Sequence, residues 1–238
     1  TNSRNPYKGL ADHQFWRKAV AAVAPGDINP MVNARFRIGR RDRVGTAGSC
    51  FAQHIARRLS KEGFNYFVTE APPPGMTAEE ASGKSYGPFS ARYGNVYTVR
   101  QLRQLLARCL GWFAPLDTAW KSVRQGYIDP FRPEIEEQGL AAPELVENAT
   151  VAHLTQVARL FRETGIFVFT LGLTEAWRRK ADGAVFPIAP GVVAVDIDMD
   201  DYEFVNFSYE EVRDDLAAFI SDLRGINPQR KLVLTVSP

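Results

Sequence analysis

The chain has 238 residues, a length that fits one large domain or two small ones. Its 45% hydrophobic and 24% charged residues are typical of a globular protein and exclude an intrinsically disordered chain. Twenty-nine basic residues against 27 acidic ones give a net charge of +2, which is too balanced for a protein that binds nucleic acid or a membrane through bulk charge.

The cysteine content bears on the cellular compartment. Cys50 and Cys109 are too few for a disulfide framework, and a reducing compartment is the simpler interpretation. No apolar run reaches the roughly 18 residues of a membrane span, and no signal-peptide pattern opens the chain at Thr1. We therefore expect a cytoplasmic protein without a membrane partner.

The first third of the chain predicts a βαβ unit after an irregular start. Proline and glycine punctuate residues 1–40, which leaves one short helical stretch near 12–23. From residue 42 a strand ends in glycine at 48, a helix runs from 49 to 63, and a second strand covers 64–68. Ser49 is at the N-cap position of that helix, and Gly63 is at its C-cap position.

The middle of the chain breaks this alternation. The prolines at 72–74 exclude a helix or a central strand, and the aromatic residues between 112 and 131 lie among prolines and glycines. We therefore expect an irregular insertion at residues 70–150. Apolar spacing predicts amphipathic helices at 98–110 and 150–164.

The last third returns to alternating strands and helices. The near-continuous apolar run at 165–172 predicts a parallel strand that is covered on both faces. Short strands at 183–195 and 202–207 form a hairpin-like excursion, and a helix at 208–223 leads to a final strand at 231–236. We expect an α/β fold in which strands 43–47, 64–68, 166–171 and 231–236 lie parallel and adjacent. Because the last strand ends one dipeptide before Pro238, we also expect the domain to continue beyond it.

Chemistry is expected where parallel strands end, because sites in open α/β sheets lie at the carboxyl ends of the strands. Three segments fall there: 48–52, 172–175 and 237–238. Only the first combines a glycine turn, a nucleophilic side chain and a helix N-terminus, whose unpaired amides can stabilise an oxyanion. Ser49 and Cys50 are both candidate nucleophiles. The structural alternatives are a helix cap for Ser49 and a small buried residue for Cys50.

Several separated blocks resemble the GSCFA family. They are the pentapeptide Gly-Ser-Cys-Phe-Ala at 48–52 and the segments 5–8, 64–67, 92–98, 129–133, 170–177 and 232–238. The family is placed with the SGNH, or GDSL-like, hydrolases. The resemblance implies a three-layer α/β/α sandwich that forms a single domain over residues 1–238, with the insertion at 70–150 inside it. It also implies acyl-ester chemistry.

The resemblance assigns roles to individual residues. The first sequence block of the SGNH hydrolases is Gly-Asp-Ser, and its serine is the nucleophile. Strict alignment of this block with residues 48–50 implies that Cys50 is the nucleophile. A shift of the alignment by one residue implies Ser49, which also agrees with the use of serine by most members of the superfamily. The second block implies that the Gly94 amide lines the oxyanion hole, with Asn95 as a side-chain donor beside it. The third block puts Thr174 where an asparagine is usual, and a hydroxyl can still donate one hydrogen bond. The last block, an aspartate and a histidine, is expected after Pro238.

Two further side chains are candidates for substrate binding. His54 is one helical turn from Cys50 on the same face, although an ordinary surface histidine is the alternative. Glu175 follows a buried strand, where it could orient Arg178 or a substrate hydroxyl; a charge at a helix N-terminus is the alternative. No phosphate loop, zinc spacing or dinucleotide fingerprint occurs, so no metal and no cofactor is expected.

The leading hypothesis is an acyl-ester hydrolase or O-acyltransferase that acts on a small-molecule ester, with acylated carbohydrate as the first guess. The second is a non-catalytic binding protein that retains the fold, which the threonine at 174 motivates. The third is a cysteine-dependent, thioesterase-like enzyme. The oligomeric state is not readable from the sequence.

Overall fold

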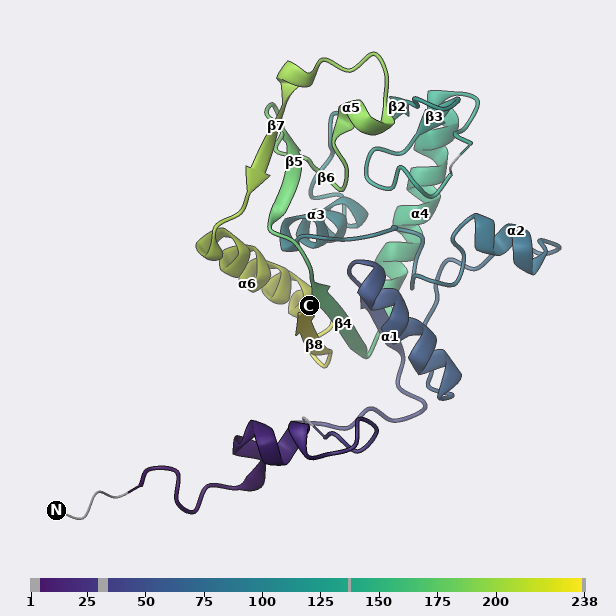
Figure 1. Ribbon diagram of the computed structural model, residues 1–238. Helices are drawn as coiled ribbons and strands as arrows, with labels where there is room; N and C mark the ends of the chain where they lie inside the picture. Colours follow the sequence, from purple (N-terminus) through teal and green to yellow (C-terminus); the bar gives the residue numbers. More distant parts are fainter. Residues whose placement is uncertain (1–4, 30–33, 137, 237–238) are drawn as a thin grey trace. The chain divides into compact units, whose positions relative to one another are not determined.

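The computed structural model describes residues 5–29, 34–136 and 138–236, and the chain divides into two compact units, Thr1–Gly39 and Arg40–Pro238 (Figure 1). In the first unit a 3-10 helix at Asp12–Gln14 and a π-helix at Arg17–Ala21 occupy the stretch where a short helix was predicted. The second unit contains all the strands that the structure assigns among the described residues.

The second unit alternates helices and strands along most of its length. Its helices are α1 (Cys50–Lys61), α2 (Ala78–Gly83), α3 (Val99–Cys109), α4 (Pro143–Glu163), α5 (Pro190–Val193), the 3-10 helix η3 (Met199–Asp201) and α6 (Tyr209–Ile226). Its strands are β1 (Val44–Ala47), β2 (Trp120–Lys121), β3 (Tyr127–Ile128), β4 (Ile166–Leu171), β5 (Glu175–Arg179), β6 (Val185–Phe186), β7 (Tyr202–Asn206) and β8 (Lys231–Val236).

A parallel sheet forms from three of the four strands that were expected to be adjacent. Its order is β1-β4-β8, and β4 is hydrogen-bonded in parallel to both neighbours. The segment at 64–68 joins the sheet at Val44, which forms a parallel bridge with Tyr66. The Val44 amide donates to the Asn65 carbonyl at 3.0 Å, and the Phe67 amide donates to the Val44 carbonyl at 2.9 Å. The prediction of a mixed α/β fold with a parallel sheet is therefore confirmed. Because the strands are parallel, the carboxyl ends of β1, β4 and β8 share one edge.

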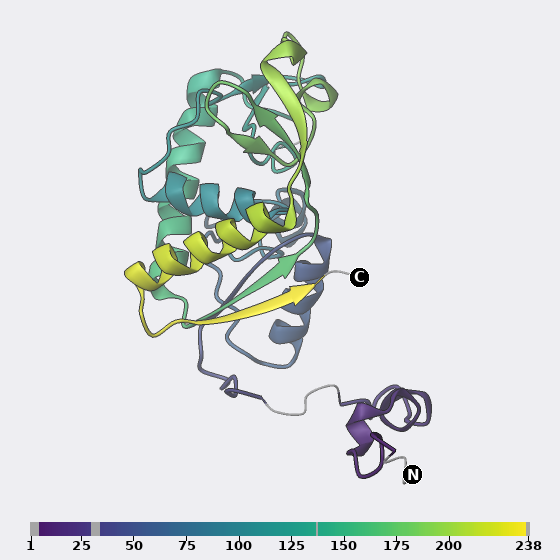
Figure 2. The ribbon, with the colours of Figure 1, turned by 90° about the vertical axis from the view of Figure 1, so that its left-hand side faces the viewer.

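Both faces of β4 are covered, as its apolar sequence predicts. On one face Phe167 packs against Phe161 of α4 and Phe219 of α6, at ring-centroid distances of 5.3 and 6.2 Å. On the other face Thr170 lies beside Gly48 at the start of α1. Figure 2 shows α6 on one side of β4 and β8 and α1 on the other. Alternate residues of one strand thus bind helices on opposite sides.

The second sheet differs from the expected pair of strands at 183–195 and 202–207, of which the second is present as β7. It is antiparallel with the order β6-β5-β7; β6 covers only two residues, and a short helix, α5, follows it. The central strand β5 was not predicted, because Glu-Ala-Trp-Arg-Arg carries too many charges to read as a strand. Those charges are paired with other segments, since Arg178 binds Glu203 at 2.7 Å and Arg179 binds Asp117. Pairing with neighbouring strands therefore stabilises β5, although its own sequence is too polar to predict a strand.

The region at 70–150 is more ordered than an irregular insertion. It contains α2, α3, the β2–β3 hairpin and the first turns of α4, which begins at Pro143 rather than at 150. Proline is favourable at the first helical position, so the helix starts there. Buried residues of α3, including Leu102 and Leu106, belong to the same core as Phe167. This region therefore helps to form the main core.

None of the helices in the described part of the chain is both long enough and apolar enough to cross a lipid bilayer.

The contact between α6 and the sheet generates a stability prediction. Phe219 is 0% exposed and touches both Phe161 and Phe167, so Phe219→Ala is expected to lower the free energy of unfolding by about 3–5 kcal/mol. Phe204→Ala is the matched control, because Phe204 is 54% exposed on β7 and its loss should cost under about 1 kcal/mol. Urea unfolding followed by circular dichroism measures both, and equal losses would contradict this packing.

Candidate active site

The connection between β1 and α1 is a glycine turn of unusual tightness. Gly48 has φ +147°, and a Cβ at this residue would lie 2.8 Å from the Thr170 Cβ and 3.0 Å from the Ala52 Cβ. Only glycine fits such a conformation and such spacing. The strand therefore passes into the helix within two residues, and Ser49 and Cys50 emerge at the carboxyl edge of the parallel sheet.

Ser49 stands at the N-cap position of α1 without acting as a cap. Among the described residues, its side chain accepts no hydrogen bond from the first amides of the helix. It is 8% exposed, and its Oγ faces Gly172, where an added Cβ would lie 4.0 Å away. The Ala52 amide donates to the Ser49 carbonyl at 2.9 Å. The Cys50 and Phe51 amides, which precede it, thus remain available to another acceptor, because a helix leaves its first amides without carbonyl partners.

Cys50 is the first residue of α1 and is exposed. The alternative that it is a small buried residue is therefore wrong. The other cysteine, Cys109, is half-buried, and its Sγ donates to the Leu106 carbonyl at 3.1 Å. Burial raises the pKa of Cys109 to about 12. The two thiols therefore occupy contrasting environments.

A loop crosses the edge of the sheet beside this turn. The Val96 amide donates to the Gly48 carbonyl at 2.9 Å, and the Leu173 amide donates to the Tyr97 carbonyl at 2.9 Å. The buried Tyr93 hydroxyl donates to a backbone carbonyl of β1. The loop is therefore tied both to the end of β1 and to the segment that follows β4.

This loop carries two of the predicted oxyanion donors. Gly94 is buried with φ +72°, a left-handed conformation that favours glycine. Asn95 is half-buried, and its Oδ1 accepts a hydrogen bond from Gln53 Nε2 of α1 at 3.4 Å. The bonds of Val96 and Gln53 therefore bring Gly94 and Asn95 next to the Gly48 turn. Gln53 was not predicted as a site residue.

Tyr97 is a second residue that sequence reasoning missed. Burial raises the pKa of its phenol, and the charge of Glu134 raises it further, while a hydrogen bond with Asn95 opposes the rise. The phenol therefore stays protonated at neutral pH, close to Asn95. It can donate or accept a hydrogen bond at the mouth of the site.

Thr174 is engaged with another strand. Its Oγ1 donates to Asn206 Oδ1 at 2.7 Å, and both residues are exposed. The proton that Thr174 was expected to give to an oxyanion is therefore committed to Asn206 of β7. The same bond orients the Asn206 amide, a residue that no motif indicated.

The two remaining predicted residues lie at the surface. Glu175 is exposed on β5 and does not orient Arg178, which bonds Glu203 instead. The reason is geometric, because residues three apart on a strand point to opposite faces. His54 is exposed on α1, and its Nδ1 lies 3.3 Å from the Arg57 guanidinium.

A largely buried cluster of ionisable side chains, here called the Glu70 network, bonds to the loop. It consists of Glu70, Arg92, Asp129, Arg132 and His153. Glu70 accepts the Arg92 amide at 2.8 Å and His153 Nδ1 at 2.7 Å. Arg132 binds Asp129 at 2.8 Å and donates to the Arg92 carbonyl at 3.2 Å. The network thus bonds to both backbone groups of Arg92, two residues before Gly94.

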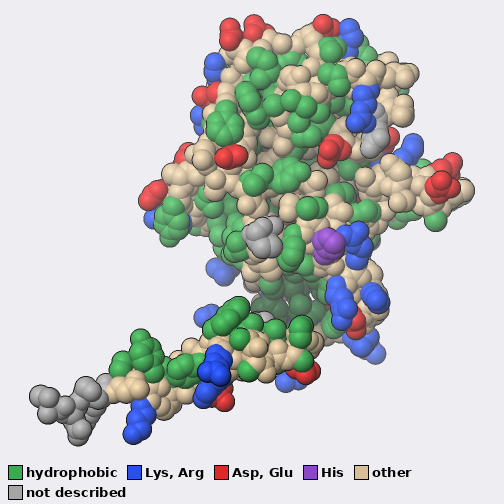
Figure 3. Space-filling model, viewed as in Figure 1, with side chains coloured by type: hydrophobic (Ala, Val, Ile, Leu, Met, Phe, Trp, Pro, Cys, Tyr) green, Lys and Arg blue, Asp and Glu red, His purple; other side chains and the backbone are tan. Residues whose placement is uncertain are grey.

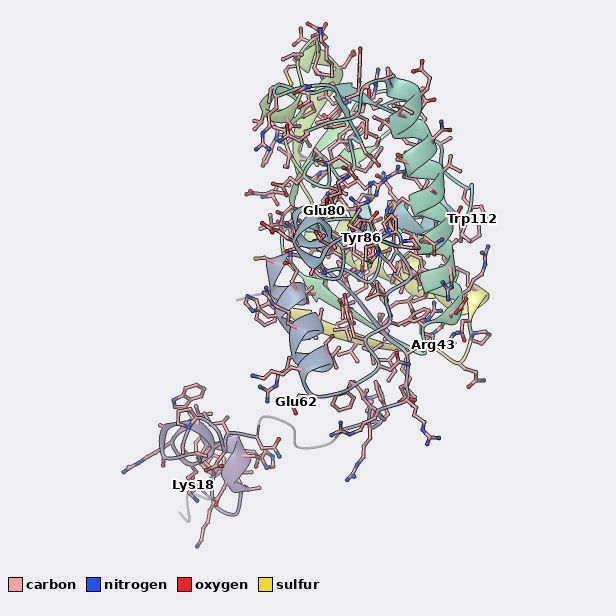
Figure 4. The ribbon with its side chains drawn as sticks, turned by 90° about the vertical axis from the view of Figure 1, so that its right-hand side faces the viewer. Lys18, Arg43, Glu62, Glu80, Tyr86 and Trp112 are labelled. Carbon is pink, nitrogen blue, oxygen red and sulfur yellow. The ribbon has the colours of Figure 1, made fainter. Side chains whose placement is uncertain are left out.

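The charge states within the Glu70 network follow from burial and from the two arginines. Burial, reinforced by the Arg132 charge, lowers the pKa of His153 to about 4, so the imidazole is neutral at pH 7 and donates to Glu70. Burial alone would raise the pKa of Asp129, but Arg132 and Arg108 lower it to about 2. The ring of Tyr86, labelled in Figure 4, stacks on the Arg92 guanidinium at 4.0 Å.

Comparison with protein families decides the relationship of this chain. The model of the GSCFA family matches residues 43–238, which is most of the chain.

The chain belongs to the GSCFA family.

The GSCFA pentapeptide at 48–52 is the glycine turn and the first residues of α1. No curated protein and no solved structure matches the chain. The family relationship therefore covers nearly all of the second unit, including the candidate site.

The neutral, buried His153 makes stability depend on pH. An unfolded chain binds a proton at this imidazole below about pH 6.5, whereas the folded protein does so only near pH 4. The free energy of unfolding should therefore fall by about 2 kcal/mol between about pH 7 and pH 5. His153→Asn keeps a donor for Glu70 but removes the titration, so its unfolding free energy should be flatter over this range. Urea unfolding at several pH values tests this, and parallel curves for both proteins would exclude the assignment.

Proposed function

We propose that this protein is an acyl-ester hydrolase or O-acyltransferase of the SGNH type, with its nucleophile at the Gly48 turn. One observation carries the proposal. Ser49 and Cys50 stand at an uncapped helix N-terminus on the carboxyl edge of a parallel sheet, and a loop with Gly94 and Asn95 is bonded to the same turn. A nucleophile surrounded by such donors is what acyl transfer requires.

The reaction proceeds through an acyl-enzyme. The nucleophile attacks the ester carbonyl, and the carbonyl oxygen becomes an oxyanion that the α1 and Gly94 amides and the Asn95 side chain stabilise. The carbon–oxygen bond of the ester then breaks, and the alcohol leaves with a proton. Water, or the hydroxyl of a second substrate, attacks the acyl-enzyme, releases the acid or a new ester, and returns a proton to the nucleophile.

Accessibility favours Cys50 as the attacking atom. Cys50 is exposed, whereas Ser49 is buried against Gly172. The strict register of the GSCFA pentapeptide with Gly-Asp-Ser also points to Cys50. In that case the acyl-enzyme is a thioester, as in the cysteine-dependent alternative. Ser49 remains the serine-type alternative.

The arrangement of layers supports the SGNH assignment. A parallel sheet has α1 on one side and α4 and α6 on the other, which is compatible with a three-layer α/β/α sandwich (Figure 2). His54, one turn from Cys50, is the imidazole that this helix offers as a base.

A non-catalytic binding protein is the second candidate function. It is favoured by Thr174, whose hydroxyl proton is given to Asn206 rather than held for an oxyanion. It is also favoured by the position of His54, which faces the Arg57 guanidinium.

Substitution of the two candidate nucleophiles tests the proposal. On the full natural chain with nitrophenyl acetate as substrate, Cys50→Ala should lower kcat/KM by at least about 1,000-fold, because no acyl-enzyme can form. Ser49→Ala should lower it by less than about tenfold. The measurement is release of nitrophenolate under saturating and limiting substrate.

Cys109→Ala is the matched control, since it also removes a cysteine and should leave the rate unchanged. A loss confined to Ser49→Ala would make the serine the nucleophile. Equal rates for all three variants and the natural protein would reject the hydrolase proposal and favour a binding protein.

A further inference from the structure

An apolar cavity of about 270 Å³ opens in the part of the second unit that carries α5 and the β2–β3 hairpin. Figure 3 shows hydrophobic side chains gathered over this part of the surface. Most of the lining side chains are aliphatic or proline: Val123, Ile128, Pro133, Ile188, Val192 and Val193. Such concave apolar sites are where small ligands bind, since burial of their apolar surface stabilises the complex.

The walls of the cavity are fixed to one another. The Val123 amide of the hairpin donates to the Val193 carbonyl of α5 at 3.0 Å, and the Val195 amide donates to the Lys121 carbonyl at 2.9 Å. Ile128, on the opposite strand of the hairpin, is buried and packs in a core with Trp120. The cavity is therefore a preformed feature, and its shape does not require a ligand.

The cavity adjoins the candidate active site. Pro133, Glu134 and Ile188 line it and also line a neighbouring hollow of about 10 Å³, whose other side is formed by Asn95 and Tyr97. Hydrogen bonds from Gln53 and Val96 tie the loop that carries Asn95 and Tyr97 to the Gly48 turn. This loop therefore contacts the Gly48 turn on one side and borders the hollow beside the cavity on the other.

We propose that this cavity binds the acyl chain of the ester substrate, an inference that rests on the proposed function. The carbonyl carbon lies at the Gly48 turn, and the chain extends past Glu134 and Ile188 into the space beside Val192. A sugar ring fits this lining poorly, because the described lining residues include no aromatic ring for it to stack on; their polar side chains are Ser122, Arg124 and Glu134. The volume suits a short to medium chain rather than a long one. The alcohol portion of the ester then faces solvent near Cys50.

Binding of uncleavable amides tests the cavity without relying on turnover. Butanamide, hexanamide and octanamide retain the carbonyl and resist hydrolysis. The affinity should rise about fourfold for each added methylene until the cavity is full. Chemical-shift titration of the full natural chain measures these affinities, and amides that bind with equal affinity would overturn the inference.

A matched pair of variants locates the binding. Val192 and Val151 are both 66% exposed, but only Val192 lines the cavity. Val192→Asp should weaken the binding of octanamide by roughly tenfold and that of butanamide by less than about twofold, because only the longer chain reaches the new charge. Val151→Asp should change neither, and equal losses in both variants would overturn the inference.

The two proposals fail differently. Chain-length-dependent amide binding without cleavage of nitrophenyl esters would refute the hydrolase and leave the cavity in place. Cleavage that depends on Cys50 or Ser49, together with amide affinities that are independent of chain length, would refute the cavity alone.

Discussion

A side chain at residue 48 would collide with Thr170, and the candidate site depends on this steric constraint. Because Gly48 has no Cβ, α1 begins within two residues of the end of β1 and against β4. The constraint has two consequences. It presents Ser49 and Cys50 at the sheet edge, and it leaves the Gly48 carbonyl free to accept the Val96 amide. One missing methyl group therefore positions both the nucleophile and the loop beside it.

The Glu70 network positions the loop, as the steric constraint at Gly48 positions the start of α1. It buries charges from three separated parts of the chain, and buried charges are tolerated only when they are paired and hydrogen-bonded. The bonds from Glu70 and Arg132 to the backbone of Arg92 fix where the loop approaches the sheet. The region at 70–150 thus contributes to the site as well as to the core.

Local sequence patterns were sufficient to predict the elements that depend mainly on residues close together in the chain. The apolar run at 166–171 predicted β4, and the glycine turn predicted the start of α1. Features that depend on distant partners were missed. The strand β5 is polar and exists because β7 pairs with it, and the Glu70–His153 bond joins residues 83 positions apart. The Thr174–Asn206 bond was missed for the same reason, since no local motif shows which acceptor a hydroxyl will find.

Covalent trapping tests the central claim, that the Gly48 turn carries a nucleophile, most directly. The full natural chain is mixed with nitrophenyl acetate, quenched with acid within milliseconds and digested with trypsin, and the peptide covering 44–57 is analysed by mass spectrometry. We predict a single acetyl group on this peptide, located at Cys50 or Ser49, that appears before any other site is modified. Acetylation confined to lysines, at a rate unchanged when both residues are replaced by alanine, would contradict it.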